Sequence, residues 1–285
     1  MVDPADLLGA ELPLLRRPSL LAIVSSNMLA LYLARDTAIR PEGFIIEGPL
    51  AGGHNAPPGG NRQLDDDSQP IYGPRDDADL GKIAALGLPF WLAGAYARPE
   101  RLASALAAGA TGIQVGTLFA LSRESGITDR LRSQLFALLD GGGTPTVRTD
   151  ALASPTGFPF KVVALADTLA ERAVYENRER LCDLSYLRQP FLQTNGTVGY
   201  RCASEPVHMF VRKGGVAEST VGRVCLCNAL ISTVGLGQTR KDGYSEPPLV
   251  TLGADIESVK ALYDRHPGGW SARDVIAWLG LEPGN

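Results

Sequence analysis

The chain has 285 residues, of which 45% are hydrophobic and 20% are charged, so it can bury a sizeable core in one large or two modest domains. Its formal net charge of −4 at pH 7 gives no general basic field, which argues against nucleic acid and anionic membranes as partners. Residues 1–36 lack the pattern of a signal peptide, because acidic residues come first and polar residues interrupt the apolar run 20–33. We therefore expect a cytoplasmic protein.

Short β-branched runs alternate with Ala- and Leu-rich stretches over the first half of the chain. This pattern predicts four strands, at 20–26, 43–48, 89–94 and 112–117, and four helices, at 27–36, 78–87, 98–109 and 128–140. Such alternation is typical of βα units with a parallel sheet. A complete (β/α)₈ barrel needs eight strands in ~250 residues, so four units predict either a small open sheet or half of a barrel.

The pattern changes after residue 140, and we divide the chain into 1–140 and a C-terminal extension, 141–285. Residues 141–150 have the composition of a flexible connector, and 154–165 predict a turn that leads into a strand. The region 190–250 is rich in Gly, Pro, Thr and Cys and has weak periodicity, so we expect it to be irregular.

Two helices are predicted in this extension. The first is long, at 167–183, with Asp167 or Thr168 as its N-cap and Glu171 placed as in a capping box. The second is the final helix, at 271–280, which begins after a Ser271 cap.

Small residues follow three consecutive predicted strands, in the sequences AGGH, AGAY and QVGT. Glycine after a strand is ordinary turn chemistry when it occurs once. Three such ends on consecutive βα units let a ligand approach the backbone, whose N–H groups can cradle a phosphate. Together they favour a phosphate site at the last two strand ends.

His54 ends the stretch FIIEGPLAGGHN and lies in a loop after a strand. Imidazole titrates near pH ~6.5, so His54 can accept or donate a proton at neutral pH. The alternative is a surface histidine that bonds its own loop. Asn55 and the prolines that follow it predict a stiffened loop, which suits a catalytic residue. We assign no role to His208 and His266.

The four cysteines, Cys182, Cys202, Cys225 and Cys227, all lie within one stretch of the extension. Their closest spacing is C-x-C, whereas zinc sites usually contain C-x₂₋₄-C pairs. Buried free thiols are the preferred interpretation and a four-thiolate metal site stays open, so no metal ligand is predicted. The sequence contains no Ser-His-Asp triad pattern, P-loop or HExxH motif.

The motifs EGPLAGGHN (47–55) and GATGIQVGT (109–117) resemble those of the nitronate monooxygenases, formerly called 2-nitropropane dioxygenases. The resemblance covers residues 18–126, and later segments such as SPTGFPFK and CDLSYLR resemble the C-terminal extension of one bacterial subgroup. The same flavin-barrel superfamily includes FMN-dependent enoyl-acyl-carrier reductases, which also carry an AGGH loop.

This resemblance implies an FMN-binding (β/α)₈ barrel, or TIM barrel, in which His54 is the catalytic histidine. It also implies that the cofactor contacts residues at several strand ends, namely Glu47, Gly52, Gly53, Gly94, Ala95, Gln114, Val115, Gly116 and Thr117. Ala95 stands where the family usually has a second glycine of the phosphate loop.

The AGGH strand is the sixth of eight in this family, so the four strands of this chain resemble the fifth through eighth. Half of a barrel exposes the edges and the inner face of its sheet. We therefore expect a partner chain or self-association to complete the barrel.

The resemblance leaves three functions open. The first is FMN-dependent oxidation of alkyl nitronates with O₂ to a carbonyl compound and nitrite, in which His54 abstracts the α-proton of a nitroalkane or holds the nitronate oxygens. The second is an FMN-dependent enoyl-thioester reductase of fatty acid or polyketide synthesis. The third is a half-barrel subunit that is inactive without its partner chain.

Overall fold

The computed structural model describes residues 6, 9, 18–61 and 63–281. Residues 1–5, 7–8 and 10–17, on which the predicted lack of a signal peptide partly depends, therefore lie outside the described residues. None of the helices in the described part is both long and apolar enough to cross a membrane.

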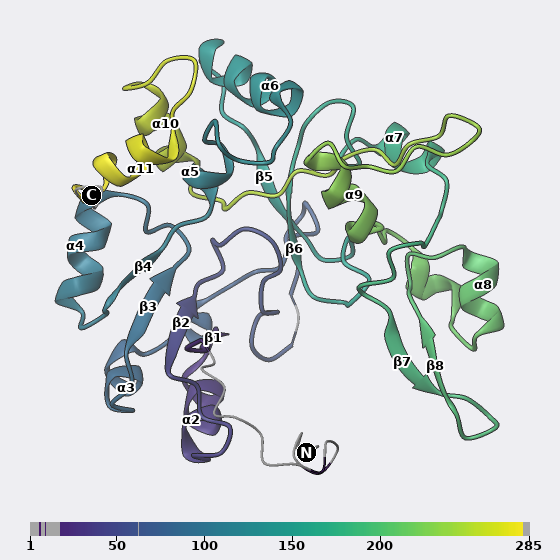
Figure 1. Ribbon diagram of the computed structural model, residues 1–285, viewed down its shortest axis with the longest axis horizontal. Coiled ribbons are helices and arrows are strands. Elements are labelled where there is room, and N and C mark those ends of the chain that lie inside the picture. Colours follow the sequence, from purple (N-terminus) through teal and green to yellow (C-terminus); the bar gives the residue numbers. More distant parts are fainter. Residues whose placement is uncertain (1–5, 7–8, 10–17, 62, 282–285) are drawn as a thin grey trace.

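A four-stranded parallel sheet occupies the first half of the protein (Figure 1). Its strands follow the chain order and are β1 (Leu21–Val24), β2 (Gly43–Glu47), β3 (Phe90–Ala93) and β4 (Gly112–Gln114). Neighbouring strands pair in parallel, with Ile46 opposite Val24 and Leu92 opposite Ile46. All four predicted strands are confirmed, as the parallel sheet of a mixed α/β protein.

One face of this sheet packs against three helices, α2 (Asn27–Arg35), α3 (Leu80–Ala84) and α4 (Pro99–Ala107). Alternate strand residues point to this face, where Phe44 and Phe90 are almost completely buried beside Ile83 of α3. Side-chain caps start two of the helices: Ser26 accepts a hydrogen bond from the N–H of Leu29, and Asp79 caps α3 in the same way. The helices predicted in this half are confirmed.

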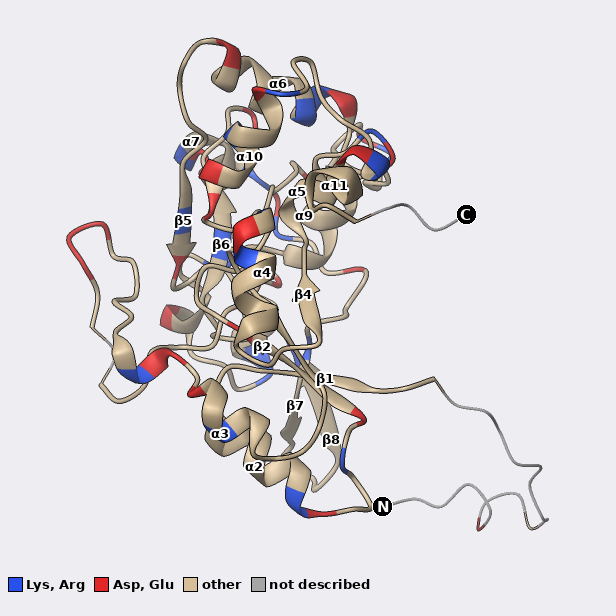
Figure 2. Ribbon diagram, turned by 90° about the vertical axis from the view of Figure 1, so that its left-hand side faces the viewer, with Lys and Arg blue, Asp and Glu red and all other residues tan. Residues whose placement is uncertain are grey.

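The opposite face of the sheet is only partly covered. Trp91 spreads over this face beside Gly43 and Gly112, where a Cβ atom would come within 3.1 Å of its ring. Ile23 of the edge strand β1 shares the face and keeps 55% of its surface exposed. Glu47 is the only charged residue in the four strands, and Figure 2 shows β1, β2 and β4 almost without charge. Parallel sheets are normally covered on both faces, so this face is suited to further packing.

The second half contains two small antiparallel sheets and several helices. The strands are β5 (Val147–Asp150) with β6 (Phe160–Val163), and β7 (Gln189–Leu192) with β8 (Val198–Arg201). The remaining helices are α5 (Thr117–Ala120), α6 (Asp129–Asp140), α7 (Arg172–Asn177), α8 (Val207–Arg212), α9 (Leu226–Thr233), α10 (Ile256–Tyr263) and α11 (Ala272–Trp278), with 3₁₀ turns η1 (Pro74–Asp76) and η2 (Ala217–Thr220). The β7–β8 hairpin and α8 lie on the opposite side of the molecule from α4 (Figure 1).

The largest apolar cluster joins residues far apart in the chain. Leu118 of α5 and Leu135 of α6 pack there with Val250, Leu262 and Trp270. Trp270 is completely buried, and its Nε1–H donates a hydrogen bond to the carbonyl of Leu118 over 2.7 Å. This cluster packs residues 250–279 against α5 and α6, which follow β4.

Three predictions for the extension are wrong. The region 190–250 is not irregular throughout, because it contains most of the β7–β8 hairpin as well as α8 and α9. Residues 141–150 are not all connector, because Val147–Asp150 form β5 and pair with β6 in antiparallel register. The long helix 167–183 is only α7, which has six residues and begins after Glu171 instead of Asp167 or Thr168. Tertiary contacts override helix propensity there. The helix ends before Arg178, whose backbone is extended and whose buried side chain donates to the carbonyl of Arg223.

Other predictions are confirmed. The strand expected within 154–165 is β6. Ser271 caps α11, and Asp274 completes a capping box.

Replacing Trp270 with Ala should lower the free energy of unfolding by about 3–5 kcal/mol, because it empties a fully buried site. Urea denaturation followed by circular dichroism measures this loss. Trp270→Phe removes mainly the hydrogen bond to Leu118 and should cost about 1 kcal/mol. Equal losses in the two variants would contradict the assignment of Trp270 to the core.

Candidate functional site

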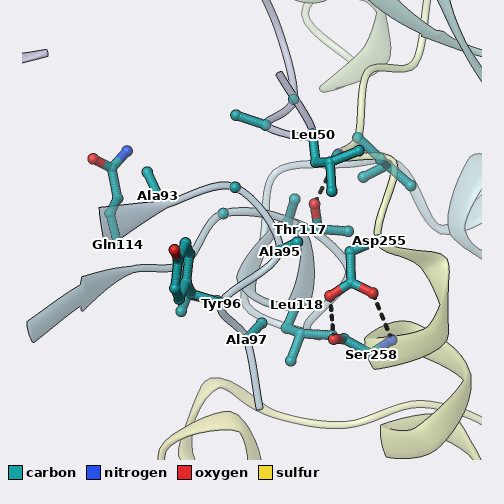
Figure 3. A pocket seen from close by; sticks show the side chains of 18 of the residues that line it. Leu50, Ala93, Ala95, Tyr96, Ala97, Gln114, Thr117, Leu118, Asp255 and Ser258 are labelled. Carbon is teal, nitrogen blue, oxygen red and sulfur yellow. Dashed lines mark hydrogen bonds between the residues drawn. The ribbon is translucent and has the colours of Figure 1, made fainter. Parts of the chain in front are cut away.

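A cavity of about 330 Å³ lies at the carboxyl ends of β2, β3 and β4 (Figure 3). This is the edge at which parallel α/β sheets hold ligands. The cavity brings together every position that the resemblance implied for the cofactor: Glu47, Gly52, Gly53, Gly94, Ala95, Gln114, Val115, Gly116 and Thr117. Residues from three separate strand ends therefore converge on one space.

The loop after β2 packs closely against a C-terminal segment. A Cβ atom on Gly52 would lie 2.9 Å from the backbone of Leu252 and Gly253, so only glycine fits there. The N–H of Gly53 donates to Thr251 Oγ1 over 2.9 Å, and the N–H of Ala254 donates to the carbonyl of Leu50. Gly52 thus has a structural reason for its identity, in addition to any contact with a ligand.

The turn after β3 contains two consecutive left-handed residues. Gly94 has φ +87°, and a Cβ atom there would lie 3.1 Å from the backbone nitrogen of Ala51. Ala95 has φ +65°, a conformation that costs a residue with a Cβ atom roughly 1–2 kcal/mol. The turn keeps the geometry of a two-glycine loop although its second residue is alanine.

The end of β4 leaves space that no protein atom fills. Gly116 has φ −111°, which any residue adopts, and a Cβ atom there would meet nothing within 4 Å. Neither backbone strain nor packing therefore requires glycine at this position. Thr117 is engaged behind the cavity, where its Oγ1 accepts a hydrogen bond from the N–H of Gly253. The open space at Gly116 fits the close approach of a ligand to the backbone.

The C-terminal region contributes part of the wall, which sequence reasoning missed. These residues are Thr251, Leu252, Gly253, Asp255 and Ser258. Figure 3 shows the Asp255 carboxylate directed at Ser258. Asp255 is the N-cap of α10, and its carboxylate accepts hydrogen bonds from the N–H and the hydroxyl of Ser258. An acidic residue directly before an apolar periodic segment is a recognisable N-cap signal, and it could have predicted this helix.

The charges around the cavity are compatible with a flavin phosphate bound through backbone N–H groups. Of the described residues, none of those that line the cavity is Lys or Arg. Arg98 lies behind the wall, where its Nε donates to Ser258 Oγ over 3.2 Å. The carboxylate of Asp255 is occupied by its cap hydrogen bonds. The glycine-rich strand ends are thus the main donors available to an anion.

His54 does not line this cavity, although its neighbour Gly53 does. Its side chain turns toward the C-terminal region, where Nε2 lies 2.7 Å from the Oγ of Ser154. The ring also meets the edge of Phe160, with centroids 4.9 Å apart. Partial burial lowers the pKa of His54, so the imidazole is neutral at pH 7. Much of the residue remains accessible to solvent.

The His54 loop is held as an extra strand beside β6. Asn55 donates its N–H to the carbonyl of Pro159, and Lys161 donates its N–H to the carbonyl of Gly53. His54 itself forms an antiparallel bridge with Phe160. The histidine of the first half is therefore positioned by backbone bonds to the second half.

Lys161 is a buried cation next to this loop. Only 4% of its surface is exposed, and its Nζ donates to the hydroxyl of Thr149 on β5. Burial lowers the pKa of Lys161 to about 8. Sequence reasoning did not select this residue.

Glu47 forms a wall between two cavities. It lines the main cavity and a second one of about 250 Å³, which Ser25, Ser26 and Arg75 also line. Burial raises the pKa of the Glu47 carboxyl above its usual range. A carboxyl in this environment protonates more readily, and it can then donate as well as accept a hydrogen bond.

The four cysteines are free thiols, but only Cys202 and Cys225 are buried as expected; Cys182 and Cys227 are partly exposed. In the part of the chain that the structure describes, no three His, Cys, Asp or Glu side chains form a group that could hold a metal ion. Cys225 and Cys227 contact each other: the Cys225 thiol and nearby backbone N–H groups lower the pKa of Cys227 to about 6. The same contact raises the pKa of Cys225.

Replacing Ala95 with Gly should raise the free energy of unfolding by about 0.5–1 kcal/mol, because relief of the left-handed strain exceeds the added flexibility of the unfolded chain. The matched control is Ala103→Gly in the middle of α4, which should instead lower the free energy of unfolding by about 1 kcal/mol. Thermal or urea denaturation distinguishes these opposite signs. A loss in both variants would refute the strain at Ala95.

Replacing Lys161 with Met should stabilise the protein at pH 7. The unfolded chain holds the lysine proton more tightly than the folded chain, whose Lys161 pKa is about 8 against an ordinary 10.5. The penalty is therefore full below pH 8 and is relieved as the pH rises toward 10.5. Urea denaturation across this range should show a rise in stability that Lys161→Met removes. The exposed Lys82→Met should leave the pH dependence unchanged.

Comparisons with known proteins complete the description of the site. No family model matches the chain, and no curated protein matches it. Among solved structures, FabK from Thermotoga maritima is similar, with a TM-score of 0.47 and 18% identity over 92% of this chain and 59% of that one. A mutant of the same protein gives a TM-score of 0.44 and 18% identity, over 91% and 56% of the two chains.

The nitroalkane oxidase from Streptomyces ansochromogenes is also similar, with a TM-score of 0.35 and 26% identity over 50% of this chain and 38% of that one. This chain spans 56–59% of the FabK chains and a smaller share of the oxidase. These are partial likenesses with TM-scores below 0.5, so the function must be argued from the residues of the chain itself.

Proposed function

We propose that this chain is part of an FMN-dependent oxidoreductase, most specifically a nitronate monooxygenase that oxidises alkyl nitronates with O₂ to a carbonyl compound and nitrite. The observation that carries the proposal is the cavity at the strand ends, and above all Gly116. Its missing side chain leaves open space that neither packing nor backbone strain explains. A phosphate or ring that approaches the backbone needs such space.

The residues divide into two groups by what they offer a cofactor. Backbone N–H groups of the turns at Gly94 and Gly116 would hold the phosphate, and Glu47 would lie against the more polar part of the flavin. A bound flavin supplies the electron transfer that no side chain of this cavity provides. The protein positions the substrate and stabilises the charge that develops on it.

His54 is the residue that we expect to act on the substrate. It is accessible, and its ring is fixed by Ser154 and Phe160. A neutral imidazole at pH 7 can take the α-proton of a nitroalkane or donate a hydrogen bond to nitronate oxygens. Both roles require that the imidazole ring is held in one orientation, and the contacts with the C-terminal region hold it.

An enoyl-thioester reductase of fatty acid or polyketide synthesis is the second candidate. One ring nitrogen of His54 is already occupied by a buried hydroxyl, which suits a hydrogen bond to a thioester carbonyl as well as it suits a nitronate. The two functions differ in the electron donor. A reductase takes electrons from NAD(P)H, whereas a monooxygenase takes them from the nitronate.

The partly covered face of the parallel sheet supports a further part of the proposal. Ile23 and Trp91 lie on that face, and β1 and β4 are the edges of the sheet. We infer that these edges and this face are closed by further βα units, as in a complete barrel. A chain that stays inactive until such a partner is added would support the third reading, a half-barrel subunit.

Replacing Gly116 with Ala should weaken FMN binding about tenfold or more while changing the free energy of unfolding by less than about 0.5 kcal/mol. Quenching of flavin fluorescence on titration measures the affinity. The control is Gly73→Ala, which also adds a Cβ atom in open space but lies outside the cavity. A protein that binds no FMN, alone or with added βα units, would refute the flavin proposal.

Replacing His54 with Ala should reduce turnover by about 10²-fold or more and spare flavin binding.

Anaerobic stopped-flow mixing separates the two candidate functions: rapid bleaching of the flavin by a nitronate supports the monooxygenase. Rapid bleaching by NAD(P)H, followed by turnover of a crotonyl thioester, would instead establish the reductase.

A further inference from the structure

The ring of His54 is bound to a hydrogen-bonded chain of hydroxyl groups from the C-terminal region. Its Nε2 lies 2.7 Å from Ser154 Oγ, which lies 2.7 Å from Thr156 Oγ1. The N–H of Thr156 also donates to Ser154 Oγ over 3.3 Å. Arg223 anchors the turn that carries Ser154, since its Nη1 donates to the carbonyls of Leu152 and Ser154.

A serine this close to a histidine could be a nucleophile, but burial argues against that role here. Ser154 has no exposed surface, so a substrate cannot reach its hydroxyl. His54, by contrast, is open to solvent. The hydrogen bond between Ser154 and His54 therefore serves to orient the histidine, and Ser154 is a positioning residue.

The hydroxyl hydrogens can be arranged in two ways. In the first, Thr156 donates to Ser154 and Ser154 donates to Nε2 of His54, so each hydroxyl hydrogen has an acceptor. In the second, Nε2–H donates to Ser154 and Ser154 donates to Thr156. The hydroxyl hydrogen of Thr156 then has no acceptor among the described residues. Hydrogen-bond satisfaction within the protein favours the first arrangement.

We propose that Thr156 and Ser154 hold His54 as the neutral tautomer with its proton on Nδ1, so that the ring presents an N–H donor to an anionic substrate oxygen. In this state Nε2 is occupied, and no free basic nitrogen faces the substrate. His54 then stabilises negative charge on a nitronate or on an enolate-like thioester oxygen and does not abstract a proton. The proposal rests on the assignment of His54 to the site of the proposed function.

The groups around the ring are consistent with a neutral imidazole. Burial is what lowers the pKa of His54. The segments packed against the ring carry two cations: Arg223, which donates to the Ser154 carbonyl, and Lys161, whose backbone N–H donates to the carbonyl of Gly53.

Long-range ¹H–¹⁵N correlation spectra of ¹⁵N-histidine-labelled protein test the tautomer directly, because protonated and bare ring nitrogens have distinct shifts. His208→Gln and His266→Gln assign the three histidines and lie outside the site. We expect His54 to show a bare Nε2 and a protonated Nδ1 at neutral pH. A majority of Nε2–H in the unsubstituted protein would overturn the proposal.

A matched pair of variants tests the chain of hydroxyls. Thr156→Val keeps the shape of the side chain but removes its hydroxyl, and should shift the tautomer ratio about two- to tenfold toward Nε2–H. Thr156→Ser keeps the hydroxyl and should retain the original ratio. Equal tautomer ratios in the two variants would show that the Thr156 hydroxyl does not act on His54, and would refute the proposed chain of hydroxyl groups.

Kinetics provide a separate readout. In flavin-loaded enzyme, Thr156→Val should lower kcat several-fold with little change in KM, whereas Thr156→Ser should restore kcat. The spectra need no flavin, so a failure of the hydroxyl-chain proposal can be distinguished from a failure of the proposed function. The expected tautomer in a protein that binds no FMN would sustain the hydroxyl chain while the proposed function fails.

Discussion

The backbone pairing of the His54 loop with β6 is the constraint on which the rest of the site depends. Gly53 and Asn55 bond to Lys161 and Pro159, on either side of the bridge between His54 and Phe160. It places the histidine against Phe160 and Ser154. It also holds one wall of the strand-end cavity. Backbone bonds of this kind specify position without depending on side-chain identity, which suits a loop made mostly of small residues.

The first half of the fold could be read from the sequence because its signals are local. Near-continuous apolar strands, alternating with Ala-rich helices, define βα units whatever lies around them. The cavity residues follow from the same logic, since the carboxyl ends of parallel strands meet at one edge. Gly116 and Gly94 could therefore be placed beside each other without coordinates. The orientation of His54 could not, because its partner Ser154 lies 100 residues away.

The second half was harder to predict for a physical reason. Its strands and helices are short, and contacts distant in sequence stabilise them more than propensity does. The segment after Asn177 is extended because Arg178 and Arg180 bind distant carbonyls, at Arg223 and Thr220. A buried cation such as Lys161 likewise leaves no sequence signature. Composition indicated a loop-rich region, but it did not indicate that this region holds the histidine.

The distance along the chain between His54 and its hydroxyl partner has an evolutionary consequence. A gene fusion or recombination event with its breakpoint between the two would pass on the glycine-rich strand ends without the group that orients the histidine. The two halves must therefore be inherited as a unit, or change together. Substitutions at Ser154 or Thr156 in related chains should coincide with changes in the histidine loop, while the strand-end glycines vary independently.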